Sequence, residues 1–268
     1  DLLDIVMNAP ARLRTLVRSP FSLRPAADLL VTGFPLGTLA GLDSQIQLLD
    51  TYWEQRVTSG VGGGARQLVT RGVSRRALDD RTMTVDTTAV LAGDTAASVS
   101  LTELLSLAVL TDATALPHPG LPATIRYAHH VLHDYAVSLE FLVAAGLVGE
   151  IRRDPNIAIA AAPSIELHLQ RIWDADPVQF WTTVIELHDT GIAGLVVVHA
   201  ADVAARSLTN VAQLAALLDR IGAGDDDVAA TTLLRYLTLA HVLDRRADPS
   251  IPTAPWAQLA VELSNHLD

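Results

Sequence analysis

Apolar residues recur at helical spacing through the second half of the chain, and this periodicity constrains the fold most strongly. From Glu150 onward, short loops with Asp, Gly and Pro separate one amphipathic segment from the next. The expected helices span residues 163–173, 177–187, 192–205, 211–221, 228–243 and 256–267. Ala is abundant on their apolar faces, which allows close helix contacts. The pattern predicts a mainly α fold in which this half is an α-solenoid-like or irregular helical bundle.

Two stretches in this half have a second interpretation. Residues 194–199, Gly-Leu-Val-Val-Val-His, form an apolar run that a buried strand could also use, although a lone strand among helices is disfavoured. The run Asp225-Asp-Asp227 has the chemistry of metal ligands. Three acids before an apolar segment are more typical of a helix start, where the helix dipole favours negative charge.

The first sixty residues predict a small helical region. Residues 11–31 have a helical pattern that Pro20 interrupts, because proline lacks an N–H and disfavours the α conformation at Ser19. Ser19 and Pro20 therefore read as the N-cap and first residue of a new helix. After a loop over 37–43, with Asp43 as the expected N-cap, residues 46–57 form a strongly amphipathic helix.

A glycine-rich run, residues 60–64, ends that helix. A phosphate-binding P-loop requires a lysine that reaches the terminal phosphates, followed by Ser or Thr for magnesium. All 19 basic residues of the chain are arginine, so this motif is excluded and the run is interpreted as a flexible connector.

The order of elements that follows predicts a winged-helix domain at about residues 65–145. A helix over 65–78 precedes a short β-like segment at 82–85, and helices are expected at 87–91 and 100–110. After a proline-rich loop, polar and apolar side chains alternate over residues 124–128. This alternation predicts a strand that leads directly into a helix.

That helix contains the most unusual stretch of the sequence, residues 125–137. Tyr127, Val131 and Tyr135 recur at helical spacing and predict a buried face. His129 and His133 are four residues apart and are expected to share a second, polar face. An apolar continuation predicts that the helix runs on to about residue 145.

Composition excludes several classes of protein. The net charge of −11 makes nucleic acid an unlikely main partner, since phosphate binding needs a basic face. A local basic cluster, which DNA binding could use, is interrupted by Asp79, Asp80 and Asp86; its arginines are Arg66, Arg71, Arg75, Arg76 and Arg81. The absence of cysteine fits a cytoplasmic location, and no apolar run is long enough to span a membrane. The chain starts without Met inside an apparent helix and is interpreted as a piece of a longer protein.

Three motifs resemble motifs of the STAND NTPases of the NACHT type. These are signalling ATPases that include the NLR immune receptors, which act in defence. Tyr127-x-His129-x-x-x-His133-Asp134-Tyr135-Ala136 resembles the Phe-x-His-x-x-x-Gln-Glu-Phe/Tyr-x-Ala pattern of their winged helix. It departs from that pattern at His133-Asp134, which replaces Gln-Glu, and at Val137, which replaces a second Ala. Two upstream pieces are also similar: Leu13-x-x-Leu16-Val-Arg-Ser-Pro20-Phe-x-Leu23 to the lid domain, and residues 50–56, Asp-Thr-Tyr-Trp-Glu-Gln-Arg, to the helix before the winged helix.

The resemblance implies a helical lid domain at 1–64, a winged-helix domain at 65–148 and a helical, repeat-like sensor domain at 149–268. It also implies that His129 contacts the β-phosphate of bound ADP and that Pro20 packs near the adenine. The implied partners are an upstream nucleotide-binding domain with ADP or ATP and Mg, a protein trigger, and further copies of the protein after activation. Because the Walker A and Walker B motifs are not in these residues, they are expected to be regulatory and not catalytic.

Three alternatives use the same residues. His129 could be a core histidine bonded to the backbone. His129, His133 and Asp134 could ligate a metal, and His133-Asp134 resembles the His-Asp pair of HD-type phosphohydrolases, for which His118 would be the upstream histidine. The helical half could also be an interaction scaffold without any nucleotide switch.

Overall fold

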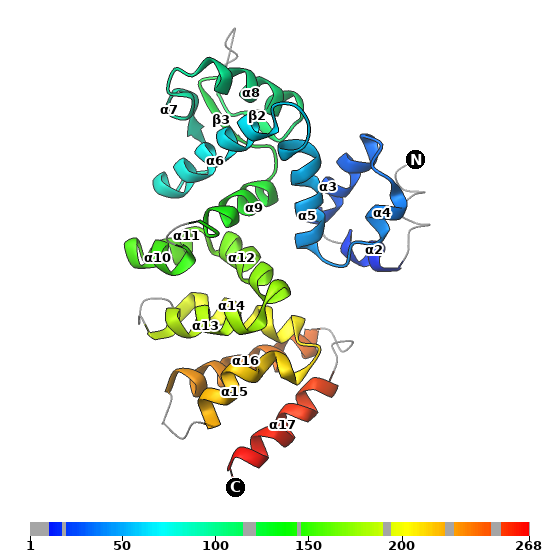
Figure 1. Ribbon diagram of the computed structural model, residues 1–268, viewed down its shortest axis with the longest axis vertical. Helices are drawn as coiled ribbons and strands as arrows, with labels where there is room; N and C mark the ends of the chain where they lie inside the picture. Colours follow the sequence, from blue (N-terminus) through cyan, green and yellow to red (C-terminus); the bar gives the residue numbers. More distant parts are fainter. Residues whose placement is uncertain are drawn as a thin grey trace. The chain divides into compact units, whose positions relative to one another are not determined.

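The computed structural model describes residues 11–17, 20–114, 122–143, 146–189, 194–222, 228–247 and 253–267. It is mainly α-helical, with one small sheet, as the periodicity predicts (Figure 1). The chain divides into two compact units, residues 1–140 and residues 141–268. The assignment of three domains at 1–64, 65–148 and 149–268 stays a prediction.

The first unit begins with a group of helices that we call the lid helices. They are α2 (Ala11–Leu16), α3 (Pro20–Val31), α4 (Leu36–Ala40) and α5 (Gln45–Trp53), and α5 continues directly into a π-helical turn, η1 (Glu54–Thr58). The helix that starts at Pro20 is confirmed. The loop expected at 37–43 is wrong in part, because α4 occupies its first half. Asp43 is not the N-cap of α5: Ser44 is, and its Oγ accepts from the N–H of Gln47.

The rest of the first unit surrounds a three-stranded sheet. Its elements are α6 (Gly63–Asp80), β1 (Val85–Asp86), α7 (Thr87–Leu91), α8 (Thr95–Ser106), β2 (Leu110–Asp112), β3 (Thr124–Tyr127) and α9 (His130–Glu140). The antiparallel strands lie in the order β1-β3-β2, with Val85 opposite Ile125 and Leu110 opposite Tyr127. Helix, strand, two helices and two strands in this sheet order make a winged helix, as the sequence predicts.

Two boundaries in the winged helix differ from expectation. The helix expected at 100–110 starts earlier and ends at Ser106, because Ala108 adopts a left-handed conformation with φ of 53° and Leu110 opens β2. The helix expected to continue to residue 145 ends at Glu140. Tyr127 lies in β3 and not in that helix, although it is buried as predicted.

A buried hydroxyl network ties the sheet to α6. Tyr127 Oη donates to the carbonyl oxygen of Thr70 at 2.9 Å and lies 2.8 Å from Ser74 Oγ. Burial is the main reason that the pKa of Tyr127 is raised, so the phenol stays protonated and able to donate. The network fixes Tyr127 two residues before His129.

The second unit is helical throughout its described residues. Its elements are α10 (Gly146–Arg153), α11 (Ile157–Ala160), α12 (Ala162–Ala175), α13 (Pro177–Asp189), α14 (Gly194–Ser207), the 3-10 helix η2 (Val211–Leu214), α15 (Ala215–Gly222), α16 (Val228–Ala247) and α17 (Ala254–Leu267). Residues 194–199 are helical, so the strand interpretation is wrong. Residues 225–227, where a helix start or metal ligands were considered, lie outside the described residues.

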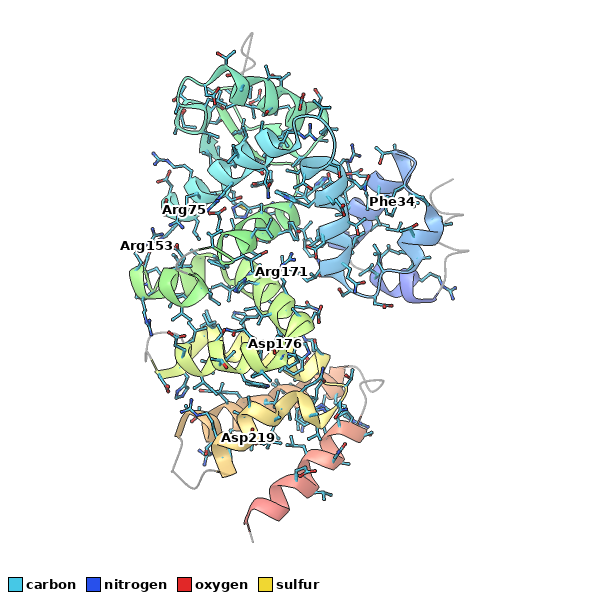
Figure 2. All side chains as sticks on the ribbon, viewed as in Figure 1. Phe34, Arg75, Arg153, Arg171, Asp176 and Asp219 are labelled. Atoms are coloured by element: carbon cyan, nitrogen blue, oxygen red, sulfur yellow. The ribbon has the colours of Figure 1, made fainter. Side chains whose placement is uncertain are left out.

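In this unit a polar side chain caps the start of α13, and an arginine links three helices. Asp176, which is labelled in Figure 2, precedes α13. Its carboxylate accepts from the N–H groups of Val178 and Gln179 at 2.9 and 3.2 Å. Arg206 on α14 pairs with acids on its own helix and on two others, namely Asp202, Glu166 on α12 and Asp244 on α16. Within the described residues, no helix has both the length and the apolarity needed to cross a membrane.

Candidate functional site

His129 lies in the turn between β3 and α9. Its carbonyl oxygen accepts from the N–H groups of Leu132 and His133 at 3.1 and 3.2 Å, so His129 occupies the N-cap position of α9. The prediction that His129 and His133 share a helix face is therefore wrong, because His129 precedes the helix. The His129 side chain therefore extends from a short turn that is held between strand β3 and helix α9.

The imidazole of His129 is half-buried, and its Nε2 is fully shielded from solvent. This atom has no hydrogen-bond partner among the residues that the structure describes. A buried polar atom without a partner costs free energy and is rare in proteins unless a ligand or water supplies the partner. The arrangement does not support the alternative of a core histidine held by a bond from Nε2 to the backbone.

Helix α3 supplies charges to this turn. Burial is the largest cause of a lowered pKa at His129, and the Arg24 guanidinium lowers the pKa further while the Asp28 carboxylate raises it. Arg24 and Asp28 are one turn apart on α3 and form an ion pair of 3.3 Å from Nε to Oδ1. Pro20 starts the same helix, one turn before Arg24. The side chain of Pro20 lies outside what the structure describes, so its predicted packing near adenine stays a prediction.

Helix α5 and its π-helical end add two further polar groups. Burial and the charge of Asp28 raise the pKa of Tyr52 to about 12, against the opposing charges of Arg56 and Arg24. Arg56 lies over the Tyr52 ring, with 5.9 Å between guanidinium carbon and ring centroid, and donates to the carbonyl oxygen of Asp28 at 3.1 Å. Single π-helical turns often mark functional sites, and here one places Arg56 beside α3.

We call these five residues, Arg24, Asp28, Tyr52, Arg56 and His129, the lid cluster. Besides His129 Nε2, the buried Oη of Tyr52 and Nε of Arg56 also have no hydrogen-bond partner among the described residues. Imidazole, phenol and guanidinium groups are all hydrogen-bond donors suited to phosphate oxygens. Two arginines against one carboxylate leave the cluster positive, so its residues fit an anionic group such as a diphosphate.

Aromatic side chains support the helix behind His129. Trp53 packs against Tyr127 and Tyr135, with ring centroids 6.3 and 5.3 Å apart. Tyr135 Oη donates to Asp50 Oδ1 at 2.6 Å, which connects α9 to α5. Of the residues predicted to form a buried face, Tyr135 thus links α9 to α5, and Tyr127 contacts Trp53 from β3.

The residues of the metal hypothesis do not converge on one point. His133 Nδ1 lies 3.4 Å from Asp134 Oδ1, and the His133 ring packs edge-on against Tyr127 with centroids 6.0 Å apart. Across the described parts of the chain, no three His, Cys, Asp or Glu residues are grouped as a metal site would require. His118, the upstream residue of the phosphohydrolase hypothesis, lies outside the described residues.

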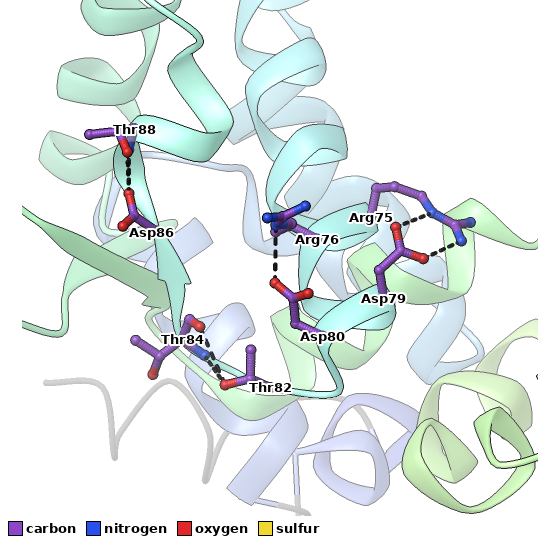
Figure 3. Close-up of polar contacts among 8 residues, drawn as sticks. All are labelled: Arg75, Arg76, Asp79, Asp80, Thr82, Thr84, Asp86 and Thr88. Atoms are coloured by element: carbon purple, nitrogen blue, oxygen red, sulfur yellow. Dashed lines mark hydrogen bonds and ion pairs between the residues drawn. The ribbon is translucent and has the colours of Figure 1, made fainter.

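The arginines of α6 pair with acids of the protein. Arg75 binds Asp79 through two hydrogen bonds, and Arg76 lies 3.0 Å from Asp80 (Figure 3). Arg66 and Arg71 pair with Glu103 and Glu140. Helix α8, the counterpart of the helix that reads DNA in helix-turn-helix proteins, carries no basic residue. Because the arginines of α6 are paired and the one charged residue of α8 is Glu103, these two helices do not form a phosphate-binding face.

The sequence identified His129 but missed most of the lid cluster. Tyr52 falls in the amphipathic helix expected at 46–57 and was given no role in a site, and Arg24 and Asp28 had no distinguishing pattern. Arg56 was part of the motif at residues 50–56, so that motif was the available signal. The missing information was the tertiary arrangement that brings α3, η1 and the β3–α9 turn together.

Comparison of the chain with protein-family models, with curated proteins and with solved structures finds no match.

Proposed function

We propose that these residues are the regulatory, non-catalytic part of a nucleotide-dependent signalling switch of the STAND type. The observation that carries the proposal is the buried, unpartnered Nε2 of His129 beside a positively charged cluster on the lid helices. In the proposed switch, His129 donates a hydrogen bond to the diphosphate of ADP. Arg24 and Arg56 provide the positive potential, and Pro20 lies near the adenine.

The diphosphate would supply the negative charge and the acceptor oxygens that the lid cluster lacks. His129 is neutral more readily than a free histidine, because burial and Arg24 lower its pKa. A nearby anion favours the protonated imidazole, so His129 would become a stronger donor when nucleotide is bound. The closed arrangement of winged helix and lid helices would then be stabilised by ADP, since a ligand favours the state it binds better.

The helical unit at 141–268 is proposed to sense a protein trigger. Apolar side chains are exposed along α16, with Tyr236, Leu239 and Leu243 between 38% and 54% accessible. Exposed apolar residues on one helix are a feature of protein-binding surfaces. The same observation favours the second candidate function, a helical interaction scaffold that works without a nucleotide switch.

The proposal predicts that His129→Ala weakens ADP binding by about 1–3 kcal/mol, the scale of a hydrogen bond to a charged group. The measurement is calorimetric titration of ADP into the natural protein that joins these residues to a nucleotide-binding domain. His130→Ala is the matched control, because His130 is the exposed neighbour of His129. Equal affinity in wild type and His129→Ala would leave the scaffold as the better proposal.

A further inference from the structure

The connector between the lid helices and the winged helix, residues 59–62, is largely exposed, since Gly60, Val61 and Gly62 are all exposed. Gly60 and Gly62 have φ of +76° and +81°, a region that glycine enters without steric cost. Val61 between them is 99% exposed. Contacts from neighbouring elements can therefore contribute strongly to the conformation of this connector.

The side chain of Arg66 on α6 binds backbone carbonyl groups of the connector. Its side chain is nearly buried, and it donates from Nε to the Val57 carbonyl and from Nη1 to the Val61 carbonyl, both at 3.1 Å. Nη2 donates to the carbonyl of Ser59. A guanidinium presents five donors in a rigid planar fork, so this single side chain can bind one carbonyl of η1 and two carbonyls of the connector.

Glu103 on α8 pairs with the same guanidinium. Its Oε2 lies 2.9 Å from Arg66 Nη1, and its side chain is 43% exposed whereas that of Arg66 is 9% exposed. A pocket of about 480 Å³ adjoins the pair and is lined by Arg66, Val99, Thr102, Glu103, Ser106 and Leu107. Glu103 is thus the part of this arrangement that solvent or a ligand can reach.

We propose that residues 59–62 are a conformational joint and that the Arg66–Glu103 pair is the latch that keeps it closed. With the latch in place, η1, the connector, α6 and α8 are fixed to one another. Without Glu103, the guanidinium loses its partner on α8, and its bonds to the connector carbonyls weaken. The glycines then allow the connector backbone to turn.

The latch follows from the geometry around Arg66 alone and requires no nucleotide. If the proposed switch is correct, opening of this joint is the motion that would let His129 and the winged helix move away from the lid helices. This role in releasing the winged helix rests on the proposed function, whereas the latch itself can be measured without nucleotide.

Hydrogen exchange at two amides of the joint tests the latch. The N–H of Ser59 donates to the Glu54 carbonyl at 2.8 Å, and the N–H of Gly63 donates to the Gly60 carbonyl at 3.2 Å. In the full chain without nucleotide, Glu103→Ala is expected to speed exchange at both amides about tenfold, because local opening becomes easier. Glu103→Gln, which keeps an acceptor oxygen, should have a smaller effect in the same direction. Arg76→Gln is the matched control, since it removes an exposed ion pair from the same helix.

Two results would overturn the latch. The first is unchanged exchange at Ser59 and Gly63 in Glu103→Ala. The second is an equal acceleration at Val69 and Val73 inside α6, which would make the pair a general support of the winged helix and not a latch of the joint.

A distance measurement provides an independent check. The chain has no cysteine, so spin labels can be placed at Thr38→Cys on the lid helices and Ala96→Cys on the winged helix. Glu103→Ala should broaden the distance distribution between the labels, and Arg76→Gln should not. A distribution that Glu103→Ala leaves unchanged would contradict a joint at residues 59–62.

Discussion

Trp181→Ala is expected to reduce the stability of the helical unit at 141–268 by about 3–5 kcal/mol, the cost of a large aromatic deletion in a core. Trp181 on α13 is completely buried. Its ring meets those of Trp173 and Phe180 edge-on, with centroids 6.1 and 5.0 Å apart. Alanine would leave a cavity among aromatic rings that α12 and α13 cannot easily close.

Trp181 also carries a hydrogen bond across the unit. Its Nε1 donates to the carbonyl oxygen of Gln213 on η2 at 2.9 Å. Trp181→Phe is therefore the matched control: it keeps an aromatic ring but removes the donor and part of the volume. We expect Trp181→Phe to cost about 1–3 kcal/mol, the range for a buried acceptor left without its partner.

Native-state hydrogen exchange is the appropriate measurement, because two compact units need not unfold together. In Trp181→Ala, the slowest amides of α12 and α13 should exchange faster by the factor by which a loss of about 3–5 kcal/mol raises the equilibrium constant for unfolding of this unit. The slowest amides of α6 and α8 should be unchanged. A loss below about 1 kcal/mol would show that the aromatic cluster is not the core of this unit.

Gly63→Ala is expected to destabilise the first unit by about 3 kcal/mol, at the upper end of the range for overpacking. A Cβ at Gly63 would lie 1.9 Å from the carbonyl oxygen of Thr58, which is backbone and cannot rotate away. Accommodating the methyl group requires η1 or the start of α6 to move. That movement would also disturb the carbonyls that Arg66 binds.

Gly64→Ala is the control for this substitution. Gly64 is the next residue of α6, and nothing lies within 4 Å of the position of its Cβ. Alanine favours helix over glycine by about 1 kcal/mol, so Gly64→Ala should be neutral or stabilising. Exchange at the slowest amides of α6 and α8 measures both variants, and equal stabilities would refute the close approach at Gly63.

The elements with strong local signals were predicted well from the sequence. Residues 87–91 form the expected short helix, and Asp86 caps it by accepting from the N–H of Thr88 at 2.7 Å. Residues 124–127 form the expected strand, because their alternation matches a half-buried position. The order of these elements was enough to predict the winged helix.

The errors occur where a backbone conformation depends on tertiary contacts. Ala108, just after α8, has a left-handed conformation that an alanine gives no reason to expect, so the expected helix was extended to Leu110, the first residue of β2. The π-helical turn at 54–58 is stabilised by Arg66 and by packing on α6. No local sequence pattern predicts such a turn. The short helix α4 contains two small residues and was taken for a loop.

The candidate site was predictable only in its most unusual residue. Two histidines four residues apart in an unusual stretch drew attention to His129, and its role in a nucleotide switch stays a prediction. Arg24, Asp28 and Tyr52 have ordinary helical surroundings in the sequence. Their grouping with His129 arises only in the fold, where the charges of Arg24 and Asp28 contribute to the pKa shifts of Tyr52 and His129.

The pKa of His129 measured by NMR, in the nucleotide-free and the ADP-bound forms of the natural protein, tests the proposed switch most directly. In the nucleotide-free form, the pKa should lie below that of a free histidine, because burial and Arg24 disfavour the imidazolium. In the ADP-bound form it should be higher, since a diphosphate beside the ring favours protonation, and ADP should then bind more tightly as pH falls through this range. A His129 pKa that is the same in both forms would contradict a contact between His129 and the diphosphate, and with it the proposed switch.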